Sequence, residues 1–250
     1  MMFLYRIYQF VIMIPLMVVV TVVTALIVML GSIVVGPRLG YYPAHVWARV
    51  MAWLSLVRVT VKGRENVRPG RACIFVANHQ GAYDIFAIYG WLNHHFVWMM
   101  KQSLRKIPLV GYACYRAGHI YVNRRTPADI KRTMETAERR LGEGYSVVVF
   151  PEGTRTKTGR LGAFKRGAFH LAEEFSLPVV PVTISGSYHV MPPQARLPRP
   201  GHITLTIHRP IEPPEDGRYD VAELMSRSRE AIASALMSGE HRGVSVRLDT

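Results

Sequence analysis

A long uncharged segment near the amino terminus sets the first limit on what this chain can fold into. Residues 10–35 contain no charged side chain, and their apolar character is interrupted only by Pro15, Thr21, Thr24, Gly31 and Ser32. A helix needs about 20 apolar residues to cross the hydrocarbon core of a bilayer. A secretory signal would have a shorter apolar core, of roughly 7–15 residues, before a small-residue cleavage site. The segment lacks such a site, so it predicts a retained membrane helix.

A second apolar stretch follows a breaker-rich turn at residues 37–43. Residues 44–57 form a wide apolar stripe that includes Trp47 and Trp53, which is typical of a helix at the level of the lipid headgroups. Packing of this stripe on the core of the protein explains it equally well. We therefore expect an N-terminal pair of membrane-anchoring helices over residues 1–58. The sequence allows both a full span and a hairpin within one leaflet.

The charge balance indicates an anionic partner. The 250 residues carry 31 Lys and Arg against 17 Asp and Glu, a formal net charge of +14, and 49% of them are hydrophobic. Anionic membrane lipids fit this composition better than nucleic acid, because no zinc-finger spacing or RNA-binding aromatic motif is present. Arg6 alone precedes the apolar segment, whereas Arg38, Arg49 and Arg58 follow it. By the positive-inside rule, the body of the protein lies on the cytoplasmic side of an inner or plasma membrane.

Residues 59–250 predict one α/β domain with a C-terminal helix. Short apolar, β-branched runs alternate with helical patterns, which favours a mostly parallel central sheet with flanking helices. The expected strands are residues 57–61, 72–77, 96–100, 119–122, 146–150, 177–184 and 203–207. The expected helices are residues 84–89, 107–116, 126–141 and 221–237. Prolines in the 177–184 strand favour a position near the edge of the sheet.

The strand at residues 72–77 leads into the first candidate catalytic group. His79 lies in the loop after this strand, and Asp84 lies on the first turn of the next helix. Such a turn can fold the carboxylate back onto one ring nitrogen and leave the other nitrogen free to act as a base. Taken alone, the pair fits equally well a polar loop histidine and a carboxylate favoured at a helix amino terminus.

Polar residues recur at the same position after three further strands. Lys101 follows the third expected strand, Arg124 follows the fourth, and the run 151–155, which includes Glu152, Gly153, Thr154 and Arg155, follows the fifth. Loops after parallel strands emerge at one edge of a sheet, where ligands bind. A histidine base and several cations are therefore expected in one crevice. A solvated loop lysine is an equally good explanation of Lys101.

The stretch from 151 to 167 is basic and rich in glycine, with Glu152 as its lone carboxylate. We expect Glu152 to hold an arginine or a substrate hydroxyl in position, although a flexible basic surface loop is the alternative. The helix expected from Thr126 begins beside Arg124, so its positive amino terminus and the guanidinium suit a dianionic headgroup.

The order of four motifs resembles the 1-acylglycerol-3-phosphate acyltransferases over roughly residues 73–185. The motifs are Asn78-His79-x4-Asp84, Gly118-x5-Arg124, Phe150-Pro151-Glu152-Gly153-Thr154-Arg155 and Val180-Pro181-Val182. The resemblance implies that His79 and Asp84 are the catalytic pair, and that Arg124, Glu152, Gly153 and Arg155 bind the acceptor. Many relatives have Asp where this chain has Asn123, which bears on the preference for the headgroup.

The resemblance implies transfer of a fatty acyl group from a thioester to the sn-2 hydroxyl of lysophosphatidic acid, giving phosphatidic acid. His79 would be the general base, and the backbone amides around Gly153 would hold the oxyanion. We expect no metal, no bound cofactor and no acyl-enzyme, with acyl-CoA or acyl carrier protein as the donor. The alternatives are another lysophospholipid or an acylated amino-acid lipid as acceptor, hydrolysis by water, and a basic membrane-binding module without catalysis.

Overall fold

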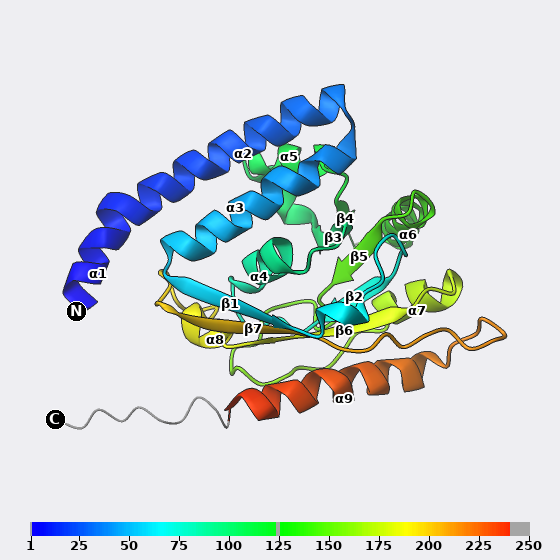
Figure 1. The fold of residues 1–250 in the computed structure, drawn as a ribbon. Coiled ribbons are helices and arrows are strands. Elements are labelled where there is room, and N and C mark those ends of the chain that lie inside the picture. Colours follow the sequence, from blue (N-terminus) through cyan, green and yellow to red (C-terminus); the bar gives the residue numbers. More distant parts are fainter. Residues whose placement is uncertain (1, 124–125, 241–250) are drawn as a thin grey trace.

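A seven-stranded sheet lies at the centre of the computed structural model, which describes residues 2–123 and 126–240 (Figure 1). The strands are β1 (Val57–Lys62), β2 (Ile74–Ala77), β3 (Phe96–Lys101), β4 (Ile120–Val122), β5 (Ser146–Val149), β6 (Val179–Ser185) and β7 (Gly201–Ile207). They are arranged in the order β1-β7-β6-β2-β5-β3-β4. All neighbours pair in parallel except β6 and β7, so the expected mostly parallel sheet is confirmed.

Helices cover both faces of the sheet. The helices of the α/β part are α4 (Asp84–Trp91), α5 (Val110–Arg116), α6 (Pro127–Gly142), α7 (Gly167–Glu174), α8 (Ser187–Val190) and α9 (Val221–Glu240). Short 3-10 turns lie at Pro37–Gly40, Arg64–Asn66 and Gln102–Lys106. Side chains of α3 and α4 share one core with the sheet, and side chains of α6, α7 and α9 share the core on the other face.

The central strand β2 shows why the sequence reads as a continuous apolar run. Phe75 and Ala77 point into the core beneath α4, whereas Ile74 and Val76 point into the opposite core. All four side chains are fully buried. A parallel strand covered on both faces has no solvent side, so no polar residue alternates with the apolar ones. The sheet therefore fixes the position of the loop that follows Ala77.

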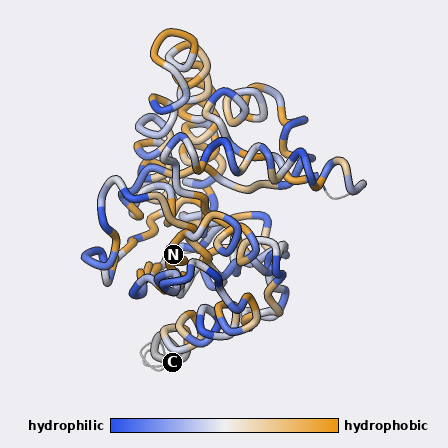
Figure 2. The backbone as a smooth tube through the Cα atoms, turned by 90° about the vertical axis from the view of Figure 1, so that its right-hand side faces the viewer, coloured by the Kyte–Doolittle hydropathy of each residue, from blue (hydrophilic) through white to orange (hydrophobic). Residues whose placement is uncertain are grey.

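The amino-terminal segment, residues 2–34, is one long helix, as expected for the first member of the pair. Helix α1 (Met2–Tyr8), a π-helical turn (Gln9–Met13) and α2 (Ile14–Val34) run on without a break, and Phe3–Val34 is long and apolar enough to cross a membrane. The hydropathy-coloured tube is most strongly orange in this part of the chain (Figure 2). Among the described residues, no second helix meets this criterion.

Helix α3 (Tyr41–Leu54) turns back antiparallel to α2 and is the expected second member of the pair. It has only 14 residues, and Ala48 and Ala52 on one face are buried in the core of the α/β domain. Val46 is 59% exposed and Trp53 is 74% exposed on the other face. Packing on the core thus explains one side of the apolar stripe, and for the exposed side the expected place at the level of the headgroups stays a prediction.

Strand β6 lies inside the sheet, between β7 and β2, so the prediction of an edge position was wrong. Each residue of an inner strand donates its N–H to one of the two neighbouring strands, and proline has no N–H to donate. The ladder between β6 and β7 is interrupted opposite Pro181: His208 donates to the Pro181 carbonyl, and pairing resumes between Val179 and Ile211. An irregularity in the partner strand therefore allows proline at an inner position.

Two helices differ from expectation. The helix expected at residues 107–116 begins only at Val110, after the 3-10 turn at Gln102–Lys106. Helix α7 was missed, because the glycine-rich stretch before it was interpreted as a loop. Its buried residues Ala168, Phe169, Leu171 and Ala172 have helical spacing that could have indicated it. The cap of α6 is confirmed, since the Thr126 hydroxyl accepts from the Asp129 amide.

The side chain of Asn78 extends the pairing of β2 with β6 beyond the last strand residue. Its amide donates to the Ile184 carbonyl at 2.9 Å, and its oxygen accepts from the Ile184 N–H at 2.8 Å. Asn78 and Ile184 are both fully buried. This pair of hydrogen bonds fixes the direction in which the chain leaves β2 toward His79.

We expect Asn78→Ala to lower the free energy of unfolding by about 2–4 kcal/mol, because it leaves two buried backbone groups unsatisfied. Chemical denaturation in detergent measures this change. Thr136→Ala, on the exposed face of α6, is the control and should change stability by less than about 0.5 kcal/mol. Equal effects of the two substitutions would contradict the assigned role of Asn78.

Candidate active site

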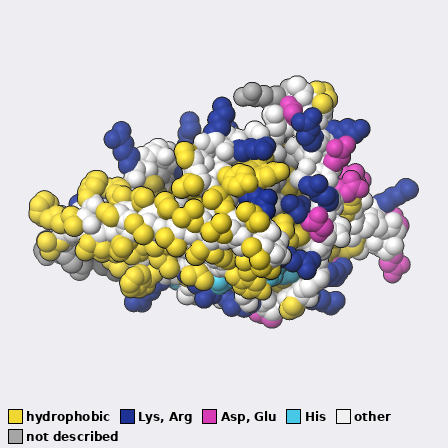
Figure 3. All heavy atoms as spheres, turned by 90° about the horizontal axis from the view of Figure 1, so that it is seen from above, with side chains coloured by type: hydrophobic (Ala, Val, Ile, Leu, Met, Phe, Trp, Pro, Cys, Tyr) yellow, Lys and Arg dark blue, Asp and Glu magenta, His cyan; other side chains and the backbone are white. Residues whose placement is uncertain are grey.

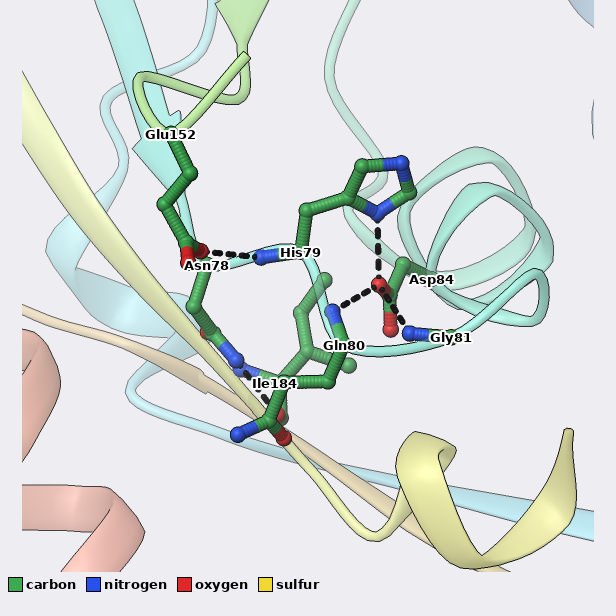
Figure 4. Close-up of polar contacts among 7 residues, drawn as sticks. All are labelled: Asn78, His79, Gln80, Gly81, Asp84, Glu152 and Ile184. Carbon is green, nitrogen blue, oxygen red and sulfur yellow. Dashed lines mark hydrogen bonds and ion pairs between the residues drawn. The ribbon is translucent and has the colours of Figure 1, made fainter. Parts of the chain in front are cut away.

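The side chains of His79 and Asp84 meet in the loop between β2 and α4 (Figure 4). The Nδ1 atom of His79 lies 2.7 Å from Oδ2 of Asp84. The same oxygen accepts from the backbone N–H of Gln80 at 2.7 Å and of Gly81 at 2.9 Å. Asp84 is fully buried, so three donors converge on a carboxylate that water does not reach.

This arrangement fixes both the position and the tautomer of the imidazole. An ionised carboxylate can only accept hydrogen bonds, so the proton on Nδ1 of His79 points at Asp84. The Nε2 atom then carries the lone pair and points away from Asp84. No residue of the described ranges donates to it, and the His79 side chain is 16% exposed. The ring can therefore take a proton from a bound molecule.

Glu152 ties the histidine loop to the basic loop after β5. Its Oε1 accepts from the His79 backbone N–H at 2.8 Å, and its Oε2 accepts from the Gly162 N–H at 2.8 Å. Burial raises the pKa of the Glu152 carboxyl above its ordinary value, while the two backbone donors act in the opposite direction. Within the described chain its partners are two backbone amides and not an arginine.

Two glycines of the site are required by close packing. A Cβ atom on Gly162 would lie 2.8 Å from Oε2 of Glu152, and one on Gly81 would lie 2.5 Å from the carbonyl oxygen of Ser187. Both contacts are closer than a side chain tolerates.

The Thr156 N–H also donates to the His79 carbonyl at 2.9 Å, which adds a second link between the loop after β2 and the loop after β5.

An aromatic stack supports the face of the imidazole. The ring centroids of His79 and Phe150 are 3.9 Å apart, with an interplanar angle of 8°. Trp98 stacks in turn on Phe150, with centroids 5.4 Å apart. Phe150 directly follows Val149, the last residue of β5, so this strand fixes its position. The stack restricts rotation of the His79 ring and excludes water from one side of it.

The backbone amide of Gly153 is not available to hold an oxyanion. Its N–H donates to the Phe150 carbonyl at 3.0 Å in a tight turn, with a φ of 75°. Of the amides around Gly153 that were expected to hold the oxyanion, the one of Gly153 itself is therefore engaged within the turn, and the role of its neighbours stays a prediction. The ammonium of Lys165 lies over Gly153 instead, close enough that a Cβ there would be 2.8 Å from Nζ.

The expected cations lie along the same edge of the sheet as His79. Lys101 is exposed at the end of β3, and Arg155 is half-buried in the loop after β5; neither forms an ion pair with any residue of the described ranges. Thr154 beside it is exposed. Strand β5 lies between β2 and β3, so the distance between these two strands is about 10 Å. The expected phosphate ligand Arg124 lies outside the described residues.

The sequence analysis missed Phe150, Trp98, Gly162 and Thr156 as parts of this site. Phe150 stands inside a recognised motif, but its stacking on His79 depends on the pairing of β5 with β2, which no short pattern encodes. The Gly162–Glu152 contact spans ten residues of irregular loop. Only the recurrence of glycine in this basic stretch signalled a close approach of backbones.

A histidine held by a buried carboxylate, with its other ring nitrogen open at the carboxyl edge of a mostly parallel sheet, has the geometry of a general base. Comparison with known proteins makes this specific. The chain belongs to the Acyltransferase family, whose profile matches residues 58–185. The family resemblance of the four motifs is thereby confirmed.

Several relatives share most of this chain. The 1-acyl-sn-glycerol-3-phosphate acyltransferase of Chlamydomonas reinhardtii is 32% identical over 199 residues, which cover 78% of this chain and 58% of that protein. The human enzyme named 1-acyl-sn-glycerol-3-phosphate acyltransferase alpha is 32% identical over 196 residues, covering 76% of this chain and 69% of that protein. The chain thus spans about half to three-fifths of the length of its algal and chloroplast relatives.

A solved structure has the same fold over nearly the whole chain. The crystal structure of the 1-acyl-sn-glycerophosphate acyltransferase PlsC from Thermotoga maritima superposes with a TM-score of 0.74 at 25% identity. The match covers 93% of this chain and 97% of the other. The similarity therefore includes the amino-terminal helices as well as the sheet.

The buried carboxyl of Glu152 gives a test by pH. Because burial raises its pKa, the folded state holds this proton to higher pH than the unfolded state does. The contribution of Glu152 to stability is then fully present below the ordinary carboxyl pKa of 4.5 and is lost as pH rises through the folded value. We expect the unfolding free energy of the unaltered chain minus that of Glu152→Gln to decline across this window.

Denaturation in detergent between about pH 4 and pH 7 measures this difference. Glu173→Gln is the control, because Glu173 lies on the exposed side of α7, where its carboxylate pairs with His170. A difference that rises with pH for Glu152→Gln would mean that the backbone donors outweigh burial.

Proposed function

We propose that this chain transfers a fatty acyl group from a thioester to the sn-2 hydroxyl of lysophosphatidic acid, forming phosphatidic acid. The observation that carries the proposal is the His79–Asp84 pair, with Nε2 open at the edge of the sheet where the cations lie. Membership of the Acyltransferase family supports the reaction type. The names of the relatives, which specify a 1-acyl-sn-glycerol-3-phosphate acceptor, support the substrate.

The reaction needs one base and no protein nucleophile. Nε2 of His79 takes the proton from the acceptor hydroxyl as that oxygen attacks the thioester carbonyl. Asp84 stabilises the imidazolium that forms. When the tetrahedral intermediate collapses, the carbon–sulfur bond breaks and the imidazolium returns its proton to the leaving thiolate. The stack on Phe150 keeps the imidazole in one orientation through both proton transfers.

The acceptor's phosphate is proposed to lie among the cations at the carboxyl edge. Arg155 can make two parallel hydrogen bonds to a phosphate, and Lys101 can add a point charge from the end of β3. Arg124 is proposed as a further ligand on the strength of its motif. Glu152, Gly153 and Thr154 shape the loop that presents Arg155. In this proposal Glu152 acts through the backbone of His79 and not by touching the substrate.

The acyl donor is proposed to be acyl-CoA or acyl carrier protein. Both are anionic, and the loop after β5 carries exposed cations that suit either of them: Lys157, Arg160, Lys165 and Arg166. A thioester is already activated toward attack, so the proposed chemistry uses neither a metal nor a bound cofactor.

We propose that the long amino-terminal helix lies in one leaflet of a membrane. Both of its ends contact the α/β part of the chain. At one end the Gln9 side chain donates to the Pro198 carbonyl at 2.8 Å, and at the other Arg116 donates to the Ser32 carbonyl at 3.3 Å. A helix of 32 residues is about 48 Å long, more than the roughly 30 Å of hydrocarbon. Spanning would carry one of these ends across the bilayer, away from its partner.

The cytoplasmic face is the proposed side, from the excess of cations that follows the apolar helix. In this position the acceptor reaches the site from the lipid phase and a water-soluble donor reaches it from the cytoplasm. This position would give one site access both to a lipid acceptor and to a water-soluble donor.

The test is an acyl-transfer assay with the purified chain that crosses both donors with lysophosphatidic acid, other lysophospholipids and an acylated amino acid. We expect His79→Ala to lower turnover by at least about 100-fold, which is the usual contribution of a general base. His170→Ala, at an exposed position of α7, should leave turnover unchanged. A near-normal rate in His79→Ala, or release of free fatty acid without acceptor, would refute the proposed mechanism.

We expect Arg155→Ala to raise the apparent KM for lysophosphatidic acid about tenfold or more, with a smaller change in kcat. A contact with a phosphate that is already present in the ground state contributes mainly to binding. The unphosphorylated monoacylglycerol is the matched acceptor, and its KM should not respond to this substitution. An equal effect on both acceptors would show that Arg155 does not bind the phosphate.

A further inference from the structure

Large apolar side chains are exposed in two segments of the chain. Within the described residues, those of high exposure occur between Phe3 and Leu56, and again at Leu104, Ile107, Leu109, Tyr112 and Tyr115. Ile130 on α6 is the one other example in those ranges. The second segment is the connection from β3 to β4 and includes α5. Its apolar side chains need an explanation, because exposed apolar patches mark interaction sites.

Helix α5 buries its small side chains and exposes its large ones, which is the opposite of a helix in a water-soluble protein. Its small residues Gly111 and Ala113 are buried, whereas Tyr112 is 53% exposed and Tyr115 is 50% exposed. A soluble amphipathic helix turns its large apolar residues toward the core. Small residues inside and large residues outside are typical of helices that pack together in lipid.

The surface of α5 continues that of α2. Ala113 and Ala117 pack on Ala25 and Val28 of α2, and Arg116 donates to Ser32 near the end of that helix. Viewed from above, a band of hydrophobic side chains follows α1 and α2, with a further hydrophobic cluster beside it where α5 packs (Figure 3). The two segments therefore form one face.

Cations accompany this face. Between residues 1 and 116 the acidic side chains are Glu65 and the buried Asp84. The same stretch has 12 Lys and Arg, of which Arg105, Lys106 and Arg116 lie within residues 104–115 or directly after them. Arg105 also stacks over the ring of Tyr115, at 4.9 Å from its centroid. Apolar and tyrosine side chains bordered by cations are complementary to a leaflet with anionic headgroups.

We propose that residues 104–115 are a second lipid-contacting element, which enters the same leaflet as α2. This inference rests on the proposed membrane location and adds to it a contact made by the α/β domain itself. Lys101 precedes the element directly, at the carboxyl end of β3. Insertion of residues 104–115 would hold this end of the sheet at the level of the lipid phosphates. The acceptor's phosphate could then meet Lys101 without leaving the headgroup region.

A nitroxide label tests the contact directly. Leu109→Cys and the control Ile130→Cys are labelled in the full chain with Cys114→Ser; Cys73 is buried and remains in place. Vesicles of mixed phosphatidylcholine and phosphatidylglycerol are then added. We expect the label at residue 109 to become more accessible to oxygen and less accessible to a water-soluble nickel chelate, and the label at 130 to stay unchanged. Equal behaviour of the two labels would refute the proposal.

A second measurement does not depend on the label. The triple substitution Leu104→Asn, Ile107→Asn and Leu109→Asn should weaken binding to these vesicles at least about tenfold, since three apolar side chains no longer enter the lipid. Ile130→Asn should have no effect. Unchanged vesicle affinity in the triple variant would overturn the inference. Failure of the proposed function would instead appear as a lack of acyl transfer by the unaltered chain.

Discussion

The buried carboxylate of Asp84 is the interaction on which the rest of the site depends. A charge removed from water is costly unless hydrogen bonds replace the lost hydration. Three donors do so at Oδ2, from the backbone of Gln80 and Gly81 and from the ring of His79, whereas the buried Oδ1 has no partner among the described residues. Because the carboxylate has no freedom to move, the imidazole has none either. A flexible loop is thereby made into a rigid support for a base.

Glu152 repeats this arrangement one strand away. Its two oxygens bind the backbone of His79 and of Gly162, so the loops after β2 and β5 form one unit. Phe150, at the end of β5, then stacks on the imidazole. The motif residues after these two strands are thus largely engaged with one another. This leaves exposed or half-buried cations such as Arg155 and Lys101 as the groups available to an anionic substrate.

Large apolar side chains point in opposite directions in the core of the sheet and in the helices α2 and α5. In the sheet, large side chains such as Phe75 and Ile74 face inward and are fully buried. In α2 and α5, small residues make the contact between the helices and the large ones face outward. One chain therefore contains two kinds of packing, one typical of water-soluble domains and one typical of helices that pack together in lipid. Their boundary runs along α3, whose Ala48 faces the core and whose Trp53 faces outward.

The sequence by itself determined most of the elements and the pairing of His79 with Asp84. Periodicity locates the strands because a buried strand excludes polar residues, and the short separation of His79 from Asp84 makes their contact a local matter. Tertiary structure decided what depends on strand order: the inner position of β6, the stack of Phe150 on His79 and the link from Glu152 to Gly162. It also decided the role of α3 and the exposure of the large side chains of α5. These features join residues that are distant along the chain or depend on neighbouring elements. Composition and local spacing therefore cannot predict them.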